Sequence, residues 1–174
     1  MTVFLLSGPS AAGKSTVGRL LAERFPRGVH LEGDVFRRSI VSGREEMTPA
    51  APAEALAQLR LRYRLAAAAA DTYAQARFTV VVEDVIAGPL LAEAAGLIRS
   101  RPLRVVVLLP SLEAVAAREA ARAAKAYERF RVGELYGRFA GGTPRLGLWL
   151  DTSGQEPHQT VDEILARTVE ADAQ

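Results

Sequence analysis

The sequence contains no cysteine and only two histidines among its 174 residues. Disulfide bonds, thiolate nucleophiles and thiolate-rich metal sites are therefore excluded, and little is left for an imidazole zinc site. No apolar stretch approaches the ~20 residues that a membrane-spanning helix needs. The N-terminus also lacks the basic and then apolar pattern of a signal segment. We therefore expect a cytoplasmic protein with no membrane partner.

Neither basic nor acidic residues predominate, since the formal net charge is only +2. So small an excess gives no reason to expect a nucleic-acid partner. The hydrophobic fraction of 49% and the charged fraction of 24% are ordinary for a globular protein. At this length, and with no repeat or linker, residues 1–174 are expected to form a single domain. The sequence gives no basis for an oligomeric state.

Short apolar runs alternate with stretches of helical periodicity. The runs cover residues 3–6, 29–31, 79–82, 105–109 and 146–150, and the helical stretches cover 14–25, 53–77, 90–100, 112–124 and 160–171. Continuous apolar runs are typical of strands that are buried on both faces, as in a parallel sheet. Ser111 and Thr160 are candidate N-caps. The pattern predicts the α/β class, with a five-stranded parallel sheet and helices on both of its faces.

A phosphate-binding loop lies between the first apolar run and the first helical stretch. Residues 8–15 read Gly-Pro-Ser-Ala-Ala-Gly-Lys-Ser and fit the Walker A pattern, Gly-x4-Gly-Lys-Ser/Thr. The expected nucleotide-binding residues are Gly8, Ser10, Ala11, Ala12, Gly13, Lys14, Ser15 and Thr16. Glycines let backbone N–H groups approach phosphate oxygens, and the following helix adds its positive end. Lys14 is expected to reach the β- and γ-phosphates of ATP, and Ser15 to bind Mg²⁺.

Acidic residues follow the second apolar run. Asp34 is expected beside the phosphate loop, because functional residues of open parallel sheets gather at the carboxyl ends of strands. Its carboxylate would accept the proton of a substrate hydroxyl, although it also suits a helix cap. Arg37, one helical turn later, is a candidate for holding substrate or phosphate. Glu32 is interpreted as structural or solvent-facing.

A second acidic pair, Glu83 and Asp84, follows the third apolar run in the manner of a Walker B element. Such an acid touches Mg²⁺ directly or through water. Strand alternation sends the two side chains to opposite sides, and the sequence does not say which one serves the metal. Asp84 could equally contact the substrate. A polar strand terminus without function is the alternative.

Basic residues are concentrated after the fourth strand. Arg118 and Arg122 share one helix face and are candidates for stabilising the transferring phosphoryl group from a lid at about residues 118–143. The alternative is a solvated helix face. A further basic and aromatic group, Arg60, Arg62, Tyr63 and Arg64, could line a substrate pocket. We interpret it as an exposed face of the long helix.

With these residues in hand, the chain resembles small P-loop kinases, in particular the chloramphenicol phosphotransferase-like group. The resemblance rests on residues 8–16, 33–34, 82–85 with Gly88, 118–122 and 150–153. It implies a three-layer, nucleoside-kinase-like fold with a short helical lid. It also implies transfer of the γ-phosphate of ATP, with Mg²⁺, to a hydroxyl of a small molecule, with Asp34 as the base. The family's paired aspartates appear here as Glu83 and Asp84.

Other interpretations remain open at this stage. Residues 31–37 are also similar to the Asp-Gly-Asp-x-x-Arg element of adenylylsulfate kinases. An adenylylsulfate-kinase-like or nucleotide-kinase-like enzyme is therefore one alternative, and a slow ATPase with a regulatory binding role is another. Residues 151–154 match the GTPase element Asp-x-x-Gly, but they lie at the wrong end of the chain, and no Asn-Lys-x-Asp signature is present. The chemical identity of the acceptor is not encoded in any motif.

Overall fold

The computed structural model describes residues 1–121 and 132–170. Five strands form one sheet with the order β2-β3-β1-β4-β5. They are β1 (Val3–Ser7), β2 (Gly28–Glu32), β3 (Thr79–Glu83), β4 (Leu103–Leu108) and β5 (Leu148–Leu150). Every pairing is parallel, and Val3 lies opposite both Val80 and Leu103. The predicted five-stranded parallel sheet is confirmed.

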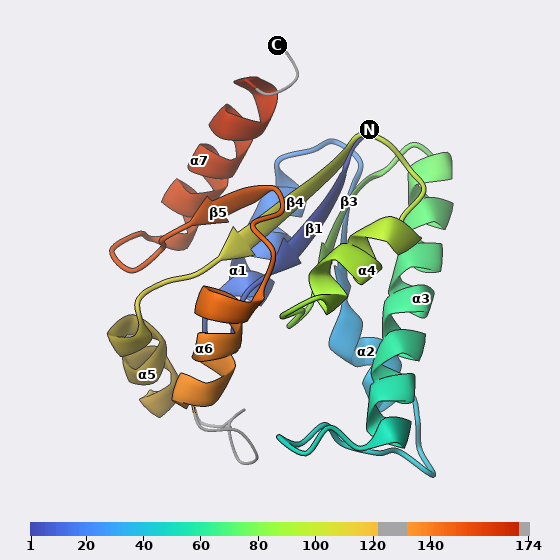
Figure 1. Cartoon of the computed structure of the whole chain (residues 1–174). Coiled ribbons are helices and arrows are strands. Elements are labelled where there is room, and N and C mark those ends of the chain that lie inside the picture. The colour runs from blue at the N-terminus through green and yellow to red at the C-terminus, as the bar shows by residue number, and fades with distance from the viewer. Residues whose placement is uncertain (122–131, 171–174) are drawn as a thin grey trace.

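Seven helices connect or flank these strands in the described residues. They are α1 (Lys14–Glu23), α2 (Gly33–Arg38), α3 (Ala53–Gln75), α4 (Leu90–Leu97), α5 (Leu112–Ala120), α6 (Val132–Gly142) and α7 (Pro157–Glu170). α1 and α7 cover one face of the sheet, and α3 and α4 cover the other (Figure 1). The result is the three-layer α/β architecture that the sequence predicts. No described helix is both long and apolar enough to span a membrane.

The side chains of β1 show why both faces of the sheet must be covered. Phe4 and Leu6 point into the core beneath α1 and α7, and Val3 and Leu5 point into the core beneath α3 and α4. All four are at most 3% exposed. Alternate residues of a strand face opposite sides, so a continuous apolar run requires two cores.

Helix α6 lies in the candidate lid, in a part of the chain where the periodicity of the sequence predicted no helix. Residues 132–142 form a helix, in which Phe139 is completely buried and Leu135 packs against the same core. Four glycines in this stretch lower its intrinsic helix propensity, and burial of its apolar residues outweighs that deficit. Residues 122–131 of the candidate lid lie outside the described residues.

The two predicted caps have different outcomes. The Ser111 side chain accepts a hydrogen bond from the Ala114 N–H at 3.2 Å and caps α5 as expected. Thr160 is not a cap, because α7 already begins at Pro157. Proline is favoured in the first turn of a helix because its missing N–H would be unpaired there anyway.

Candidate active site

The phosphate loop connects the end of β1 to the start of α1. Gly8 and Gly13 have φ angles of 149° and 92°, and Ala11 has a φ of 62°. A side chain at Gly8 would lie 2.3 Å from the carbonyl oxygen of Leu108, so this glycine also permits close approach of β4. Helix α1 starts at Lys14 with no acidic residue in its first turn. Its unpaired N–H groups therefore remain available to an anion.

Lys14 is held against this loop rather than extended into solvent. The residue is 8% exposed, and its Nζ donates to the carbonyl oxygen of Pro9 at 2.9 Å. An ammonium group in this position carries its charge at the centre of the loop. A phosphate group that enters the loop meets a cation that is already positioned for it.

Ser15 and Glu83 meet at the beginning of α1 and the end of β3. The Ser15 hydroxyl donates to Oε1 of Glu83 at 2.6 Å, and Glu83 is 6% exposed. A hydroxyl and a carboxylate beside a phosphate site are the oxygen ligands that Mg²⁺ prefers. His30 and Glu32 of β2 lie close to Glu83, with one ligand atom of each within 4.8 Å of the others. Sequence reasoning did not include His30 in this group.

Asp84, the neighbour of Glu83, lies on the other side of the strand end. Its Oδ1 accepts from Nη2 of Arg62 at 2.5 Å and from the N–H of Val85 at 2.7 Å. Burial raises the pKa of Asp84 to about 6, against the lowering effect of the Arg62 charge. The structure therefore brings Glu83, and not Asp84, into contact with Ser15. A metal-binding role for Asp84 stays a prediction, and this geometry does not favour it.

Asp34 lies in the first turn of α2, where its carboxylate is surrounded by guanidinium groups. Arg37 donates to it from Nε at 2.6 Å and from Nη2 at 3.3 Å, and nitrogens of Arg38 and Arg62 lie at 3.4 Å and 3.7 Å. Partial burial acts to raise the pKa of Asp34, but the Arg37 hydrogen bond and the three positive charges outweigh it. The net pKa is lowered. Asp34 is therefore an ionised carboxylate, able to accept a hydrogen bond or a proton.

The interpretation of residues 60–64 as an exposed helix face is wrong for two of its members. The Arg62 side chain is only 12% exposed, and Tyr63 is buried with its hydroxyl donating to the carbonyl oxygen of Val85 at 3.3 Å. Arg60 does lie at the surface, where it pairs with Glu93. Tyr63 follows Leu59 at helical spacing, and this apolar stripe was a signal that Arg62 lies at the border of the buried face.

Arg118 projects from the last turn of α5 towards the loop after β5. Its Nη2 donates to the carbonyl oxygens of Thr152 at 2.8 Å and Ser153 at 3.5 Å. The Asp151 carboxylate accepts hydrogen bonds from the Ser153 backbone and hydroxyl, which closes this loop. Arg118 therefore fixes the β5–α7 connection and does not contact Asp34. The other candidate, Arg122, lies outside the described residues.

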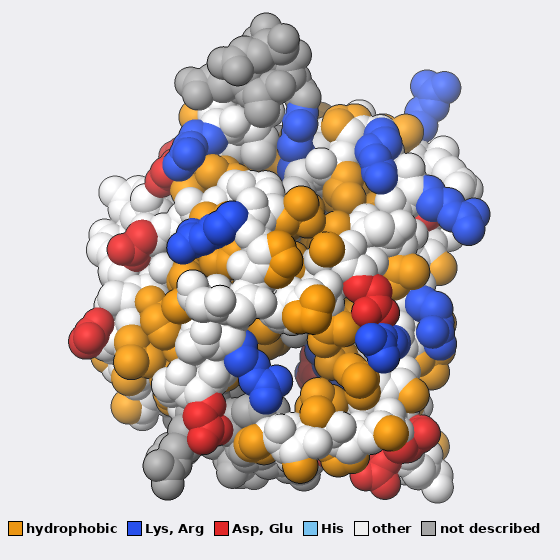
Figure 2. Space-filling view, in the orientation of Figure 1, with side chains coloured by type: hydrophobic (Ala, Val, Ile, Leu, Met, Phe, Trp, Pro, Cys, Tyr) orange, Lys and Arg blue, Asp and Glu red, His pale blue; other side chains and the backbone are white. Residues whose placement is uncertain are grey.

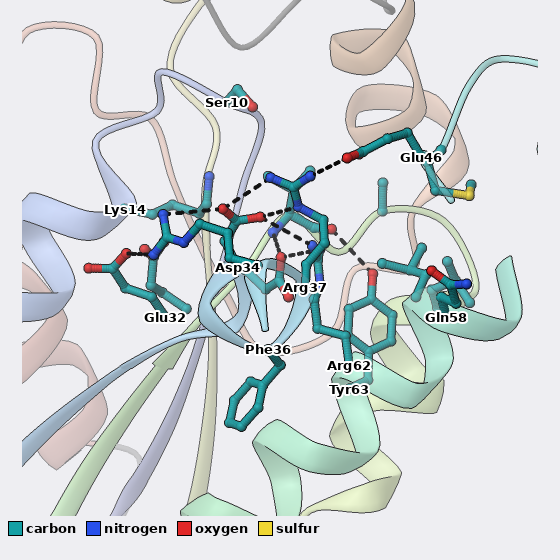
Figure 3. A pocket seen from close by; sticks show the side chains of 18 of the residues that line it. Ser10, Lys14, Glu32, Asp34, Phe36, Arg37, Glu46, Gln58, Arg62 and Tyr63 are labelled. Atoms are coloured by element: carbon teal, nitrogen blue, oxygen red, sulfur yellow. Dashed lines mark hydrogen bonds and ion pairs between the residues drawn. The ribbon is translucent and has the colours of Figure 1, made fainter. Parts of the chain in front are cut away.

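A cavity of about 760 Å³ joins the phosphate loop to Asp34. Its remaining walls come from α2, the segment 39–52, α3, the segment after β3, and α6. Figure 2 shows this face hollowed between α6 and α3, with hydrophobic and basic side chains around the hollow. In the closer view, Lys14, Asp34, Arg37 and Arg62 converge on the same space from three different elements (Figure 3). Three of the predicted site residues within the described part of the chain do not line this cavity: Gly8, Ala12 and Arg118.

This combination of sheet order, phosphate loop and acidic strand end defines the class of the protein. It has the P-loop fold of small kinases, in which a parallel sheet presents a Walker A loop beside a second, open pocket. The chain belongs to a family described as the AAA domain, whose sequence profile matches residues 3–135. No curated protein sequence matches the chain significantly.

Solved structures with the same fold include several named kinases. A sugar kinase from a Janibacter species has 17% identity and a TM-score of 0.69, and the alignment covers 95% of this chain and 92% of that one. The Deinococcus radiodurans tunicamycin resistance protein has 19% identity and a TM-score of 0.68, with 96% and 95% covered. The Mycobacterium tuberculosis APS kinase has 18% identity and a TM-score of 0.69, with 95% of each chain covered.

These neighbours confirm the predicted likeness to small P-loop kinases. They do not single out the chloramphenicol phosphotransferase-like group, so membership of that group stays a prediction. At identities below 20% the likeness establishes the fold alone.

Proposed function

We propose that this protein is an ATP-dependent phosphotransferase that moves the γ-phosphate to a hydroxyl of a small molecule. The observation that carries the proposal is the position of Asp34. Its ionised carboxylate lines the same cavity as Lys14 and Ser15 of the phosphate loop. A base beside a triphosphate site, with open space between them, is the arrangement that phosphoryl transfer to a hydroxyl requires.

The phosphate loop supplies the binding of the donor. Backbone N–H groups of residues 10–16 and the Lys14 ammonium bind the β- and γ-phosphates. Ser15 and Glu83 are the residues that fit Mg²⁺, because their oxygens already lie together beside the loop. When bound, that ion would neutralise phosphate charge and hold the phosphates in one orientation.

Asp34 supplies the chemistry at the acceptor. Its carboxylate accepts the proton of the acceptor hydroxyl while the hydroxyl oxygen forms a bond to the γ-phosphorus. The bond between that phosphorus and the β–γ bridging oxygen breaks, and ADP leaves. Arg37 holds Asp34 in place through two hydrogen bonds and is a candidate contact for the acceptor.

Arg118 contributes to the proposal from the other end of the site. By holding the carbonyl oxygens of residues 152–153, it orders the loop after β5, next to the carboxyl edge of the sheet. We assign it a positioning role towards the nucleotide. Arg122 remains the candidate for charge stabilisation during transfer.

The substitution Asp34→Asn tests this proposal directly. We expect transfer to fall by about 10²- to 10⁴-fold because an amide cannot accept the proton. Binding of an ATP analogue, followed by thermal shift, should be unchanged, because the phosphate loop is intact. Asp162→Asn is the matched control, since Asp162 is an exposed partner of Arg24 away from the cavity.

Two results would contradict the proposal. One is acceptor phosphorylation by Asp34→Asn at the rate of the unmodified protein. The other is ATP consumption with no phosphorylated acceptor across a broad screen of hydroxylated compounds. The second result would favour a slow ATPase with a regulatory role.

A further inference from the structure

The part of the cavity beyond Asp34 is rich in charge, but the guanidinium groups that α2 and α3 present to it are already paired with carboxylates. We call this part the acceptor pocket; it is lined by α2, residues 39–52, α3 and α6. Arg62 pairs with Asp84 and approaches Asp34. Arg37 pairs with Asp34 and also with Glu46, whose Oε1 lies 2.5 Å from Nη1. The guanidinium groups that α2 and α3 present are therefore bound to carboxylates.

A third guanidinium group in this part of the cavity is also close to carboxylates. Arg38 lies 3.4 Å from Asp34 and 3.9 Å from Glu32. Across the whole cavity, five basic side chains face six acidic ones within the described residues. Two members of this set, Lys14 and Glu83, belong to the phosphate and metal end. No excess of positive charge is left to attract an anionic acceptor.

An anionic acceptor would have to take a guanidinium from its present carboxylate. Asp84 is 7% exposed, so removal of Arg62 would leave a buried charge without its partner. Removal of Arg37 would leave Asp34 with Arg38 and Arg62, and Glu46 with Arg44, and would bring both carboxylates close to the incoming anion. Either exchange places like charges together in a partly closed space, which is unfavourable.

The uncharged part of the acceptor pocket is a fixed apolar wall. Phe36, Leu59 and Leu135 are partly buried and pack against the hydrophobic core while also lining the cavity. Ile40 and Met47, from the segment 39–52, also line the cavity. Figure 3 shows Gln58 on the same side as Glu46, with the Arg37–Asp34 cluster between them and Lys14. This wall offers contact to an apolar group on the acceptor.

We propose that the acceptor is an electrically neutral hydroxylated compound with an apolar face, and that carboxylates, phosphates and sulfates are poor acceptors. The proposal rests on the proposed phosphotransfer. The reactive hydroxyl approaches Asp34, and the apolar face packs on the wall formed by Phe36, Leu59 and Leu135. Discrimination against anions comes from the carboxylates that hold Arg37 and Arg62.

Matched compounds test the charge rule on the unmodified protein. One pair is phenyl β-glucoside and phenyl β-glucuronide, and another is 3-phenyl-1,2-propanediol and 3-phenyllactate; each pair differs by a carboxylate. Methyl β-glucoside lacks the aromatic ring. Binding is measured by thermal shift and calorimetry in the presence of Mg²⁺ and AMP-PNP, so that no turnover is needed.

We expect at least one neutral compound to bind about tenfold or more tightly than its anionic partner, and the phenyl glucoside to bind more tightly than the methyl glucoside. The proposal is overturned if the anionic members bind as tightly as the neutral ones, or if no neutral member binds.

The variant Glu46→Gln tests the cause of the discrimination. It removes a carboxylate from Arg37 and from Arg44 while Asp34 remains beside Arg37, so the anionic compounds should gain about tenfold in affinity relative to their neutral partners. Glu93→Gln is the matched control, because it releases Arg60 of α3 at a place outside the cavity lining. It should leave the ratio unchanged. An unchanged ratio in Glu46→Gln would contradict the proposed cause.

Transfer is measured separately from binding, so the two proposals fail in different ways. Phosphorylation of the anionic compounds in preference to the neutral ones would overturn the charge rule and support the phosphotransferase. Binding of neutral compounds with no phosphorylation of any compound would support the charge rule and count against the phosphotransferase.

Discussion

Nη2 of Arg62 lies 2.5 Å from Oδ1 of Asp84, and both side chains are almost entirely buried. This ion pair connects the middle of α3 to the end of β3. Because Asp84 also accepts the N–H of Val85, the guanidinium is anchored to the backbone of the sheet. Arg62 is thereby held 3.7 Å from Asp34, so the pair helps to set the position and charge of the proposed base.

The first prediction concerns the pH dependence of stability. Burial raises the pKa of Asp84 from 3.8 to about 6 in the folded protein. Between these values the folded state binds more protons than the unfolded state, so the free energy of unfolding contributed by this group falls as pH rises from about 4 to 6. The change amounts to up to about 3 kcal/mol.

Urea unfolding of the unmodified protein and of Asp84→Asn, from pH 4 to 7, measures this contribution. Asp34, Asp71 and Asp151 have lowered pKa values and act in the opposite direction, but they are common to both proteins. The stability of the unmodified protein relative to Asp84→Asn should decrease with rising pH. Parallel curves would show that Asp84 does not titrate in this window.

The second prediction concerns Gly33, which begins α2. A Cβ at this position would lie 2.1 Å from Oδ2 of Asp84, whose carboxylate is fixed by Arg62 and the N–H of Val85. Since the carboxylate has little freedom to retreat, Gly33→Ala should destabilise the protein by about 1–3 kcal/mol. Transfer should also decrease, because Asp34 is the next residue.

Gly137→Ala provides the comparison for this substitution. Gly137 lies in the middle of α6, and a Cβ there meets no atom within 4 Å. Alanine has the higher helix propensity, so this variant should be stabilised by up to about 1 kcal/mol. Chemical denaturation of both variants is the measurement. Equal stability of the two would show that Asp84 yields easily to a new methyl group.

The third prediction separates the two acidic residues at the end of β3. Glu83 contacts Ser15, whereas Asp84 contacts Arg62. Glu83→Gln should therefore raise the Mg²⁺ concentration at the midpoint of nucleotide binding by about ten- to a hundredfold. Asp84→Asn should leave the Mg²⁺ midpoint nearly unchanged. A titration of Mg²⁺ with a fluorescent ATP analogue measures both, and the reverse order of effects would assign the metal site to Asp84.

Much of the fold could be predicted because its signals are local. The strands at residues 3–7 and 79–83 contain unbroken apolar runs at residues 3–6 and 80–82, and the phosphate loop is a contiguous motif whose glycines have the backbone angles the motif requires. The sequence pattern did not predict helix α6, because four glycines lower its helix propensity and burial of Phe139 is needed to stabilise it. Propensity is weak evidence where tertiary packing decides.

The sequence by itself determined the nucleotide end of the site, since residues 8–16 form a contiguous loop whose chemistry depends on its own backbone and its own helix. The acceptor end was decided by tertiary structure. In the sequence, Arg62 lies more than twenty residues from both Asp34 and Asp84. Only the folded chain brings the three charged groups close together. Sequence spacing cannot show that a guanidinium is already neutralised, because that depends on which carboxylate the folded chain places against it.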